Sequence, residues 1–95
     1  MAQFLIMHCG FSPPSPEQMD GWKQWFGAVG DRTVSQAGFG DAREITADGT
    51  TELPFGPDSI TGYTVIEAAD LDEATQLAAD CPIVASTRVY ALREG

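Results

Sequence analysis

Two helix-start signals, each placed after an apolar segment, constrain the fold of this chain more than any other feature. In the first, Ser15 caps a helix, Pro16 suits its first position and Gln18 completes a capping box. In the second, Asp70 caps and Glu73 reaches back, which places acidic groups at the positive end of a helix. The sequence therefore predicts two helices, each beginning soon after a strand.

The first of these helices carries an apolar stripe, and we expect it to extend from Pro16 to about Ala37, with Gly38 as its C-cap. Its large apolar residues recur at helical spacing, which gives the helix one face to bury. We interpret most of the stripe as core, and leave open that one tryptophan lines a ligand pocket. The stripe consists of Met19, Trp22, Trp25, Phe26 and Val29.

Four strands are predicted around the helices. Residues 3–8 form the first strand, and its continuous apolar run Phe4-Leu5-Ile6-Met7 is typical of a strand buried on both faces. Residues 41–46 form the second strand, and an Asp-Gly turn then lets residues 50–53 pair back as a short extension. Residues 61–68 are rich in β-branched and aromatic side chains, and residues 86–92 alternate.

The order of these elements is β-α-β-β-α-β, so the expected fold class is α+β. Right-handed crossovers then produce a ferredoxin-like, four-stranded antiparallel sheet with both helices on one face. The first strand is apolar on both faces, so the uncovered face needs a partner, and a second copy of the chain is the simplest one. The sequence predicts a single domain over residues 1–95 that forms a homodimeric α+β barrel.

The charge of the chain is acidic and unevenly placed. Its 95 residues include 14 Asp and Glu against 5 Lys and Arg, for a formal net charge of −9. Such a balance argues against nucleic acid and against an anionic membrane surface as partners. Nine of the acidic residues lie from Glu44 to Asp80, where there is no Lys or Arg. We interpret this half as a solvated surface, with docking of a basic partner as the alternative.

We find no targeting or cofactor motif. No apolar run approaches the roughly 20 residues that span a bilayer, and the run near Met1 lacks the cationic start of a signal peptide. We therefore expect a cytoplasmic protein in which Cys9 and Cys81 stay reduced, although topology leaves their pairing open. Two cysteines and one histidine lack a fourth zinc ligand, and no nucleotide-binding motif is present, so neither a metal nor a cofactor is expected.

Several short segments stand in a characteristic order along the chain. They are Pro16-Glu17-Gln18-Met19 with Trp22 and Trp25, Val29-Gly30-Asp31, Gly62-Tyr63-Thr64-Val65-Ile66-Glu67-Ala68, Leu71-Asp72-Glu73-Ala74, Cys81-Pro82-Ile83 and Thr87-Arg88-Val89. This set resembles the YCII-related family, also called the DGPF-domain family, over nearly the whole chain. The resemblance implies a ferredoxin-like fold and a dimeric barrel. Most of that family is uncharacterised, but a few relatives are cofactor-independent enzymes, including a dehydrochlorinase that acts on a chlorinated hydroxyquinol.

The chain departs from that family where an active site is proposed. Members with such a site pair a histidine of the first helix with an aspartate, whereas the first predicted helix here contains no histidine. The Asp-Gly-Pro-Phe signature appears only as Glu52-Leu53-Pro54-Phe55, and Ile83 stands where relatives often carry a histidine. No catalytic residue is therefore carried over from the resemblance.

A candidate site follows from topology instead. The end of the first strand lies beside the start of the last, which brings His8 toward Cys81, while Tyr63 begins the strand on the other side. We predict a site at this sheet edge, with His8 as the catalytic residue and Trp22, Tyr63 and Cys81 as ligand-binding residues. Strand alternation directs His8 and Cys9 to opposite faces, which argues against a Cys–His dyad.

These features support two functions. The first is binding of a small organic molecule in a pocket at the sheet edge. The alternative is a cofactor-independent, lyase-like or dehydrochlorinase-like enzyme, in which His8 is the general base and Trp22 and Tyr63 bind an aromatic substrate. A closed pocket with a carboxylate within hydrogen-bond reach of His8 favours the enzyme, because a carboxylate orients an imidazole and raises its basicity.

Overall fold

The central strand of the structure is β1 (Ala2–Cys9), which lies between β5 (Ile60–Ala68) and β6 (Ser86–Ala91). Strand β2 (Thr33–Gly38) pairs with the far side of β5, so the sheet order is β2-β5-β1-β6. Each neighbouring pair is antiparallel. This computed structural model describes residues 1–93 and confirms the predicted four-stranded antiparallel sheet.

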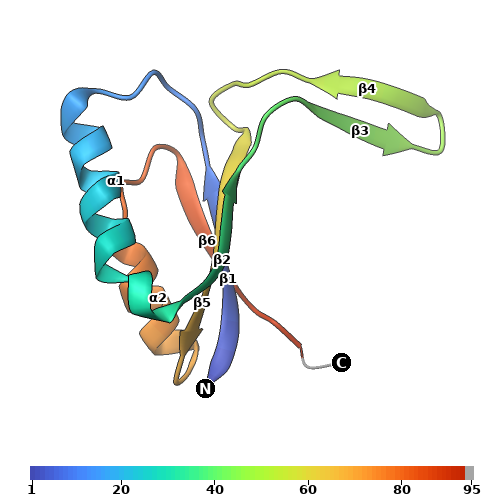
Figure 1. The fold of residues 1–95 in the computed structure, drawn as a ribbon. Helices are drawn as coiled ribbons and strands as arrows, with labels where there is room; N and C mark the ends of the chain where they lie inside the picture. Colours follow the sequence, from blue (N-terminus) through green and yellow to red (C-terminus); the bar gives the residue numbers. More distant parts are fainter. Residues whose placement is uncertain (94–95) are drawn as a thin grey trace.

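Two helices, α1 (Pro16–Ala28) and α2 (Leu71–Ala79), cover one face of the sheet (Figure 1). The predicted ferredoxin-like α+β class is therefore confirmed. Among residues 1–93, no helix is long and apolar enough to cross a membrane. The core lies between the helices and the sheet, and its buried members are Phe4, Ile6, Trp25, Val29, Ile66, Ala68, Ala74, Ala78 and Cys81.

Alternation along β1 separates the two faces of the sheet. Phe4 and Ile6 are 3% and 0% exposed against the helices, and His8 follows them on the same face. Leu5 and Met7 lie on the opposite face and are only partly buried. The helix layer therefore leaves one face of the sheet without a covering layer.

Helix α1 begins as predicted and ends earlier than predicted. The Ser15 hydroxyl accepts from the Gln18 amide, and the Gln18 side chain accepts from the Ser15 amide, both at 3.2 Å. The predicted extension to Ala37 is wrong, because the helix ends at Ala28 and a short 3₁₀ turn, η1 (Gly30–Arg32), follows. The apolar stripe also ends there, since Val29 is its last buried residue.

The second sheet strand is β2, and the prediction of residues 41–46 for this position is wrong. Strand β2 lies at the sheet edge, and five of its six residues are exposed, so it carries no apolar alternation that a sequence pattern can detect. Its last pair with β5 is Gly38 opposite Gly62. Immediately beyond it, the Phe39 amide donates to the Thr61 carbonyl at 2.8 Å.

Residues 41–46 belong instead to a separate hairpin made of β3 (Ala42–Thr46) and β4 (Gly49–Leu53). The predicted tight turn and the return strand are confirmed, and Gly49 takes a φ of +143° that favours glycine. All ten strand residues are exposed. We call this element the arm; it projects to the side of the sheet that the helices leave uncovered (Figure 1).

Helix α2 is capped as predicted and closes its end of the core. The Asp70 carboxylate accepts from the Glu73 amide at 2.8 Å. The Glu73 carboxylate accepts from the Ala69 amide at 3.1 Å and pairs with Arg32 of η1 at 2.7 Å. Together these contacts join the start of α2 to the turn that follows α1.

Candidate functional site

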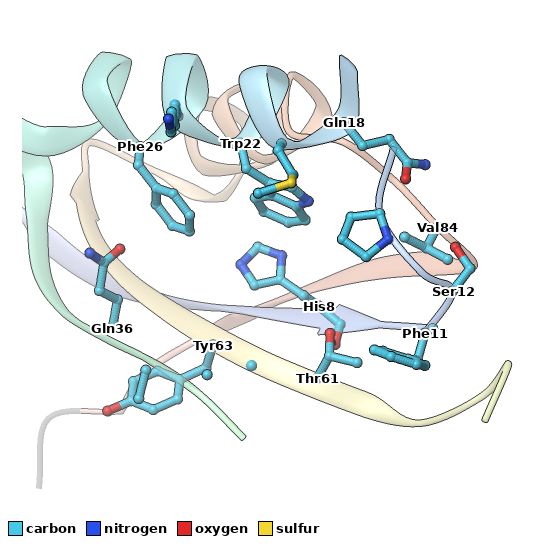
Figure 2. A pocket seen from close by; sticks show the side chains of 17 residues that line it. His8, Phe11, Ser12, Gln18, Trp22, Phe26, Gln36, Thr61, Tyr63 and Val84 are labelled. Atoms are coloured by element: carbon cyan, nitrogen blue, oxygen red, sulfur yellow. The ribbon is translucent and has the colours of Figure 1, made fainter. Parts of the chain in front are cut away.

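A pocket of about 720 Å³ opens between α1 and the sheet. This volume falls within the range of about 300–1,000 Å³ that is typical of small-molecule sites. Met19, Trp22 and Phe26 of α1 form one wall, and His8 of β1 lies below them (Figure 2). Gly62 of β5 borders the pocket beside His8, its partner in the strand register.

Two glycines that line the pocket lie very close to neighbouring segments of the chain. A β-carbon on Gly62 meets the carbonyl oxygen of Ala37 on β2 at 2.8 Å. Gly10 has a φ of +103°, and a β-carbon there meets the β-carbon of Ala85 at 2.6 Å. Backbones therefore approach each other closely at these two positions, which only glycine permits.

His8 is buried at the base of the pocket and has one ring nitrogen without a partner. The residue is 8% exposed, and its Nε2 lies 3.1 Å from the hydroxyl of Thr64. The ring meets Trp22 and Trp25 edge-on, with centroids 4.9 Å and 5.5 Å away. Its Nδ1 finds no hydrogen-bond partner within residues 1–93. Because such an atom costs about 1–3 kcal/mol when left unpaired, it favours a ligand that supplies the missing bond.

The protonation state of His8 determines which ligand atoms fit. Burial lowers the pKa of His8, so the imidazole is neutral at neutral pH. A neutral imidazole has one N–H and one acceptor nitrogen. When Nε2 donates to Thr64, Nδ1 is the acceptor, and when the Thr64 hydroxyl donates, Nδ1 carries the hydrogen. A ligand hydroxyl can donate and accept, so it satisfies Nδ1 in both tautomers.

The arrangement around His8 lacks the carboxylate of a His–Asp pair. Thr64 is the hydrogen-bond partner of the ring in the part of the chain that the structure describes, and no Asp or Glu lines the pocket. A threonine hydroxyl orients an imidazole without raising its basicity as a carboxylate does. The enzyme was expected to have a closed pocket with a carboxylate within hydrogen-bond reach of His8. The structure places His8 at a pocket, but the pocket is open and no carboxylate bonds the ring within residues 1–93.

No metal site accompanies the pocket. Residues 1–93 contain no group of three or more His, Cys, Asp and Glu side chains that is placed to hold a metal ion.

Tyr63 borders the pocket, but its ring points away from His8 (Figure 2). Thr64 shares the helix-covered face with His8, so its chain neighbour Tyr63 lies on the opposite face. There the Tyr63 ring packs against Phe39, with centroids 5.9 Å apart. The topology thus brings Tyr63 to the predicted sheet edge, while the pleat directs its side chain to the other face.

The two cysteines lie apart from the pocket wall. Cys81 is 5% exposed within the core, with its Sγ 3.7 Å from the Thr87 hydroxyl, and burial raises the pKa of its thiol. Cys9 is buried on the opposite face of β1 from His8. Both thiols are free.

Of the four predicted site residues, the structure brings His8 and Trp22 together. Sequence reasoning missed Phe26 and Gln36, which line the pocket, and Thr64, which bonds the ring of His8. Phe26 follows Trp22 by four positions on α1, and this spacing is a signal that places both on one face of the helix. Gln36 was missed because β2 was assigned to the first helix, and no sequence signal distinguishes Thr64 from other strand threonines.

Comparison with known proteins supports the fold class. No protein-family profile matches the chain, and neither does any curated protein, so membership of the YCII-related family stays a prediction. Among solved structures, the chain is similar over 98% of its length to a protein of the same α+β fold. That protein is the 5-chloro-2-hydroxyhydroquinone dehydrochlorinase TftG from Burkholderia phenoliruptrix AC1100, in complex with 2,5-dihydroxybenzoquinone. The match covers 95% of that chain, with a TM-score of 0.58 and 16% sequence identity, and at this identity it shows the fold alone.

Proposed function

We propose that this protein binds a small aromatic molecule that carries a hydroxyl or carbonyl group, in the pocket beneath α1. The observation that carries the proposal is the unpaired Nδ1 of His8, which is buried at a pocket with aromatic walls. A polar ligand atom pairs with this nitrogen, and the flat ring of the ligand lies against Trp22 and Phe26. In this arrangement His8 and Trp22 make the direct contacts, and Cys81 acts only as part of the core that supports them.

A matched pair of ligands tests the proposal. Hydroquinone has two hydroxyl groups, whereas 1,4-dimethoxybenzene has a similar ring and no hydroxyl hydrogen. We expect hydroquinone to bind about three- to tenfold more tightly, which is the effect of one hydrogen bond of about 1 kcal/mol. Tryptophan fluorescence reports the binding, because Trp22 lines the pocket, and a thermal shift checks it, since a ligand of the folded state raises the melting temperature.

His8→Phe separates the polar contact from the aromatic one. The variant keeps an aromatic ring under Trp22 and removes Nδ1, so we expect the preference for hydroquinone to disappear while weak binding of both rings remains. Tyr90→Phe is the control, because Tyr90 lies on the uncovered face of the sheet, away from the pocket lining. Failure of both compounds to bind the wild-type protein contradicts the proposal.

A second function is favoured by one specific observation, the fold shared with a dehydrochlorinase. As a cofactor-independent enzyme, the protein acts on the keto tautomer of a chlorohydroquinol, in which the carbon that bears chlorine has gained the hydrogen of one hydroxyl. The acceptor Nδ1 of His8 takes the proton of the other hydroxyl, and the O–H electron pair forms a C=O bond. The adjacent ring double bond then shifts toward the C–Cl carbon, and chloride leaves with the electron pair of the C–Cl bond. The products are a quinone and HCl, so no oxidant is required. The test is chloride release from chlorohydroquinols by wild-type protein and His8→Phe, and equal background release by both contradicts the enzyme.

We also propose that the protein is a homodimer formed through the uncovered face of the sheet. Leu5 pairs with Val65 on one side and Tyr90 on the other, so these three side chains share that face, and Tyr90 is 46% exposed. The arm extends on the same side (Figure 1). A contiguous apolar sheet face flanked by an exposed arm favours a second copy as its cover.

Light scattering tests the dimer. We expect a mass of twice the 10.2 kDa of one chain at micromolar concentration, and conversion of Leu5→Arg to the single-chain mass. Gln24→Arg adds the same charge on the exposed surface of α1 and keeps the dimer. A wild-type mass of one chain contradicts this assembly. The cytoplasm is the proposed location, because free cysteines are typical of a reducing compartment.

A further inference from the structure

Lys23 is the only lysine in the sequence, and it lies at the pocket. On α1 it follows Met19 by four residues and precedes Phe26 by three, so all three side chains lie along one side of the helix. It is also the only charged residue among those that line the pocket. The walls thus combine aromatic surface and one ammonium group, and the buried, unpaired Nδ1 of His8 belongs to a residue of the same lining.

The Lys23 ammonium is a positive charge in a predominantly acidic chain. The chain carries a net charge of −9, yet no acidic residue lines the pocket. Asp20 stands three residues before Lys23 on α1, at a spacing that permits an ion pair. Within residues 1–93, however, the only ion pair is that of Arg32 with Glu73. Lys23 is therefore an exposed cation that has no anionic partner among residues 1–93.

We infer that the ligand of this pocket carries a carboxylate, which pairs with Lys23 while its ring lies against Trp22 and Phe26. This inference rests on the proposed binding of an aromatic molecule and adds the charge of that molecule. A ring carboxylate is ionised at neutral pH, whereas a simple phenol keeps its proton, so the carboxylate is the group that an ammonium distinguishes from a neutral ligand. His8 then pairs with a second, uncharged polar atom on the ring.

A pair of probes that differ only in charge tests the inference. 4-Hydroxybenzoate and 4-hydroxybenzamide share the ring and the hydroxyl, and only the first is an anion. We expect the wild-type protein to bind the benzoate about two- to fivefold more tightly at low salt, which is the effect of an exposed ion pair. Lys23→Gln is expected to bind the two probes equally, and Lys23→Arg is expected to keep the preference.

The control variant is Arg43→Gln, which removes the same charge from the exposed arm and leaves the pocket lining intact. This variant changes the net charge as Lys23→Gln does, but it leaves the pocket ammonium in place. We therefore expect it to keep the wild-type preference for 4-hydroxybenzoate. Equal affinity of the wild-type protein for both probes overturns the inference and leaves the proposed aromatic binding in place. Absence of binding by either probe overturns both. A preference that survives in Lys23→Gln shows that another group holds the anion.

Acylation of amines provides a second measurement that does not depend on a substitution. Lys23 and the N-terminus are the two amines of the chain, so mass spectrometry can follow each separately. 4-Hydroxybenzoate is expected to slow acylation of Lys23 and to leave the N-terminal amine unaffected. Equal rates at Lys23 with and without a saturating amount of the benzoate contradict the ion pair.

Discussion

The two helices pack on the same face of the sheet, but they differ in how closely they approach it. Side chains fill the space between α2 and the sheet, which we call the closed end. The space between α1 and the sheet contains the pocket, and we call it the open end. Helix α2 presents Ala74 and Ala78 to the sheet, which are 0% and 2% exposed, and its backbone comes close to β5 and β6. Helix α1 presents Trp22, Trp25 and Phe26, and these large rings separate it from the strands. The contrast shows how residue size sets the distance between a helix and the sheet: small residues let α2 pack closely on the strands, and large rings hold α1 away from them, where the pocket lies.

The two ends also differ in how completely their polar groups are paired. On the α2 side, the Leu77 carbonyl accepts from the indole N–H of Trp25 on α1 at 2.8 Å, and Glu73 pairs with Arg32. Under α1, the Nδ1 of His8 has no partner among the residues that the structure describes. The paired groups of the closed end contribute to stability, whereas the open end holds a buried nitrogen without a hydrogen-bond partner within residues 1–93.

The largest expected effect is on the free energy of unfolding, and it differs between the two tryptophans of α1. Trp25→Ala removes a ring that is 3% exposed together with its bond to Leu77, so we expect a loss of about 3–5 kcal/mol in the free energy of unfolding. Trp22→Ala removes a half-buried ring of the pocket wall and should cost about 1–2 kcal/mol. Urea denaturation measures both values. Equal losses contradict the distinction between a core tryptophan and a pocket tryptophan.

The next largest effect is expected from a substitution on β5, at a glycine that lines the pocket. Gly62→Ala brings a β-carbon to 2.8 Å from the Ala37 carbonyl, so we expect a loss of about 1–3 kcal/mol in stability and weaker ligand binding. Gly27→Ala is the matched control, since nothing lies within 4 Å of a β-carbon there. In the last turn of α1 it should gain at most about 0.5–1 kcal/mol, the difference between Ala and Gly in a helix interior. Effects of the same sign at both positions contradict this assignment.

A smaller effect is expected from the titration of His8. Its pKa is lowered by burial, so the unfolded chain takes up the proton more readily than the folded protein. Stability is fully present above the ordinary histidine pKa of 6.5 and is lost as the pH falls below it. Urea denaturation on both sides of this pH measures the loss in the wild-type protein. His8→Phe should lose less over the same interval, and identical losses contradict the buried neutral imidazole.

The smallest effect is expected from the titration of Glu73, at the start of α2. The pKa of Glu73 is lowered by the Ala69 amide and by Arg32, so the carboxylate stabilises the fold above its ordinary pKa of 4.5. This contribution is lost as the pH falls through the lower pKa of the folded protein. Glu73→Gln should therefore melt slightly below the wild type at neutral pH, with the difference shrinking in acid, as differential scanning calorimetry can follow. A difference that grows in acid contradicts the pairing.

Most of the fold was predictable because its signals are local. The caps at Ser15 and Asp70 and the Asp48-Gly49 turn require only near neighbours in sequence, and the structure confirms all of them. Strand β2 was not predictable, because an exposed edge strand carries no apolar period. Strand β2 joins the sheet through its backbone N–H and C=O groups. Any sequence without proline supplies both groups at every residue.

Which side chains gather at the pocket was partly predictable, and how they are oriented was not. Topology placed His8 at the end of β1 near Trp22, and both line the pocket. The orientation of Tyr63 required the strand register, because a shift of one residue exchanges the two faces of a sheet. The hydrogen bond between His8 and Thr64 joins residues 56 positions apart, and nothing in the local sequence of either one encodes it.

The arm has a consequence for how this fold can be altered. Strands β2 and β5 already form an antiparallel pair, and the Phe39 amide binds the Thr61 carbonyl where the chain leaves the sheet. The arm is thus an insertion between two strands that are neighbours without it, and its ends lie at a point the sheet itself fixes. Segments of other lengths and compositions can therefore be grafted between residues 40 and 54 at little cost in loop entropy. The surface that the arm forms can therefore change without a change in the pocket.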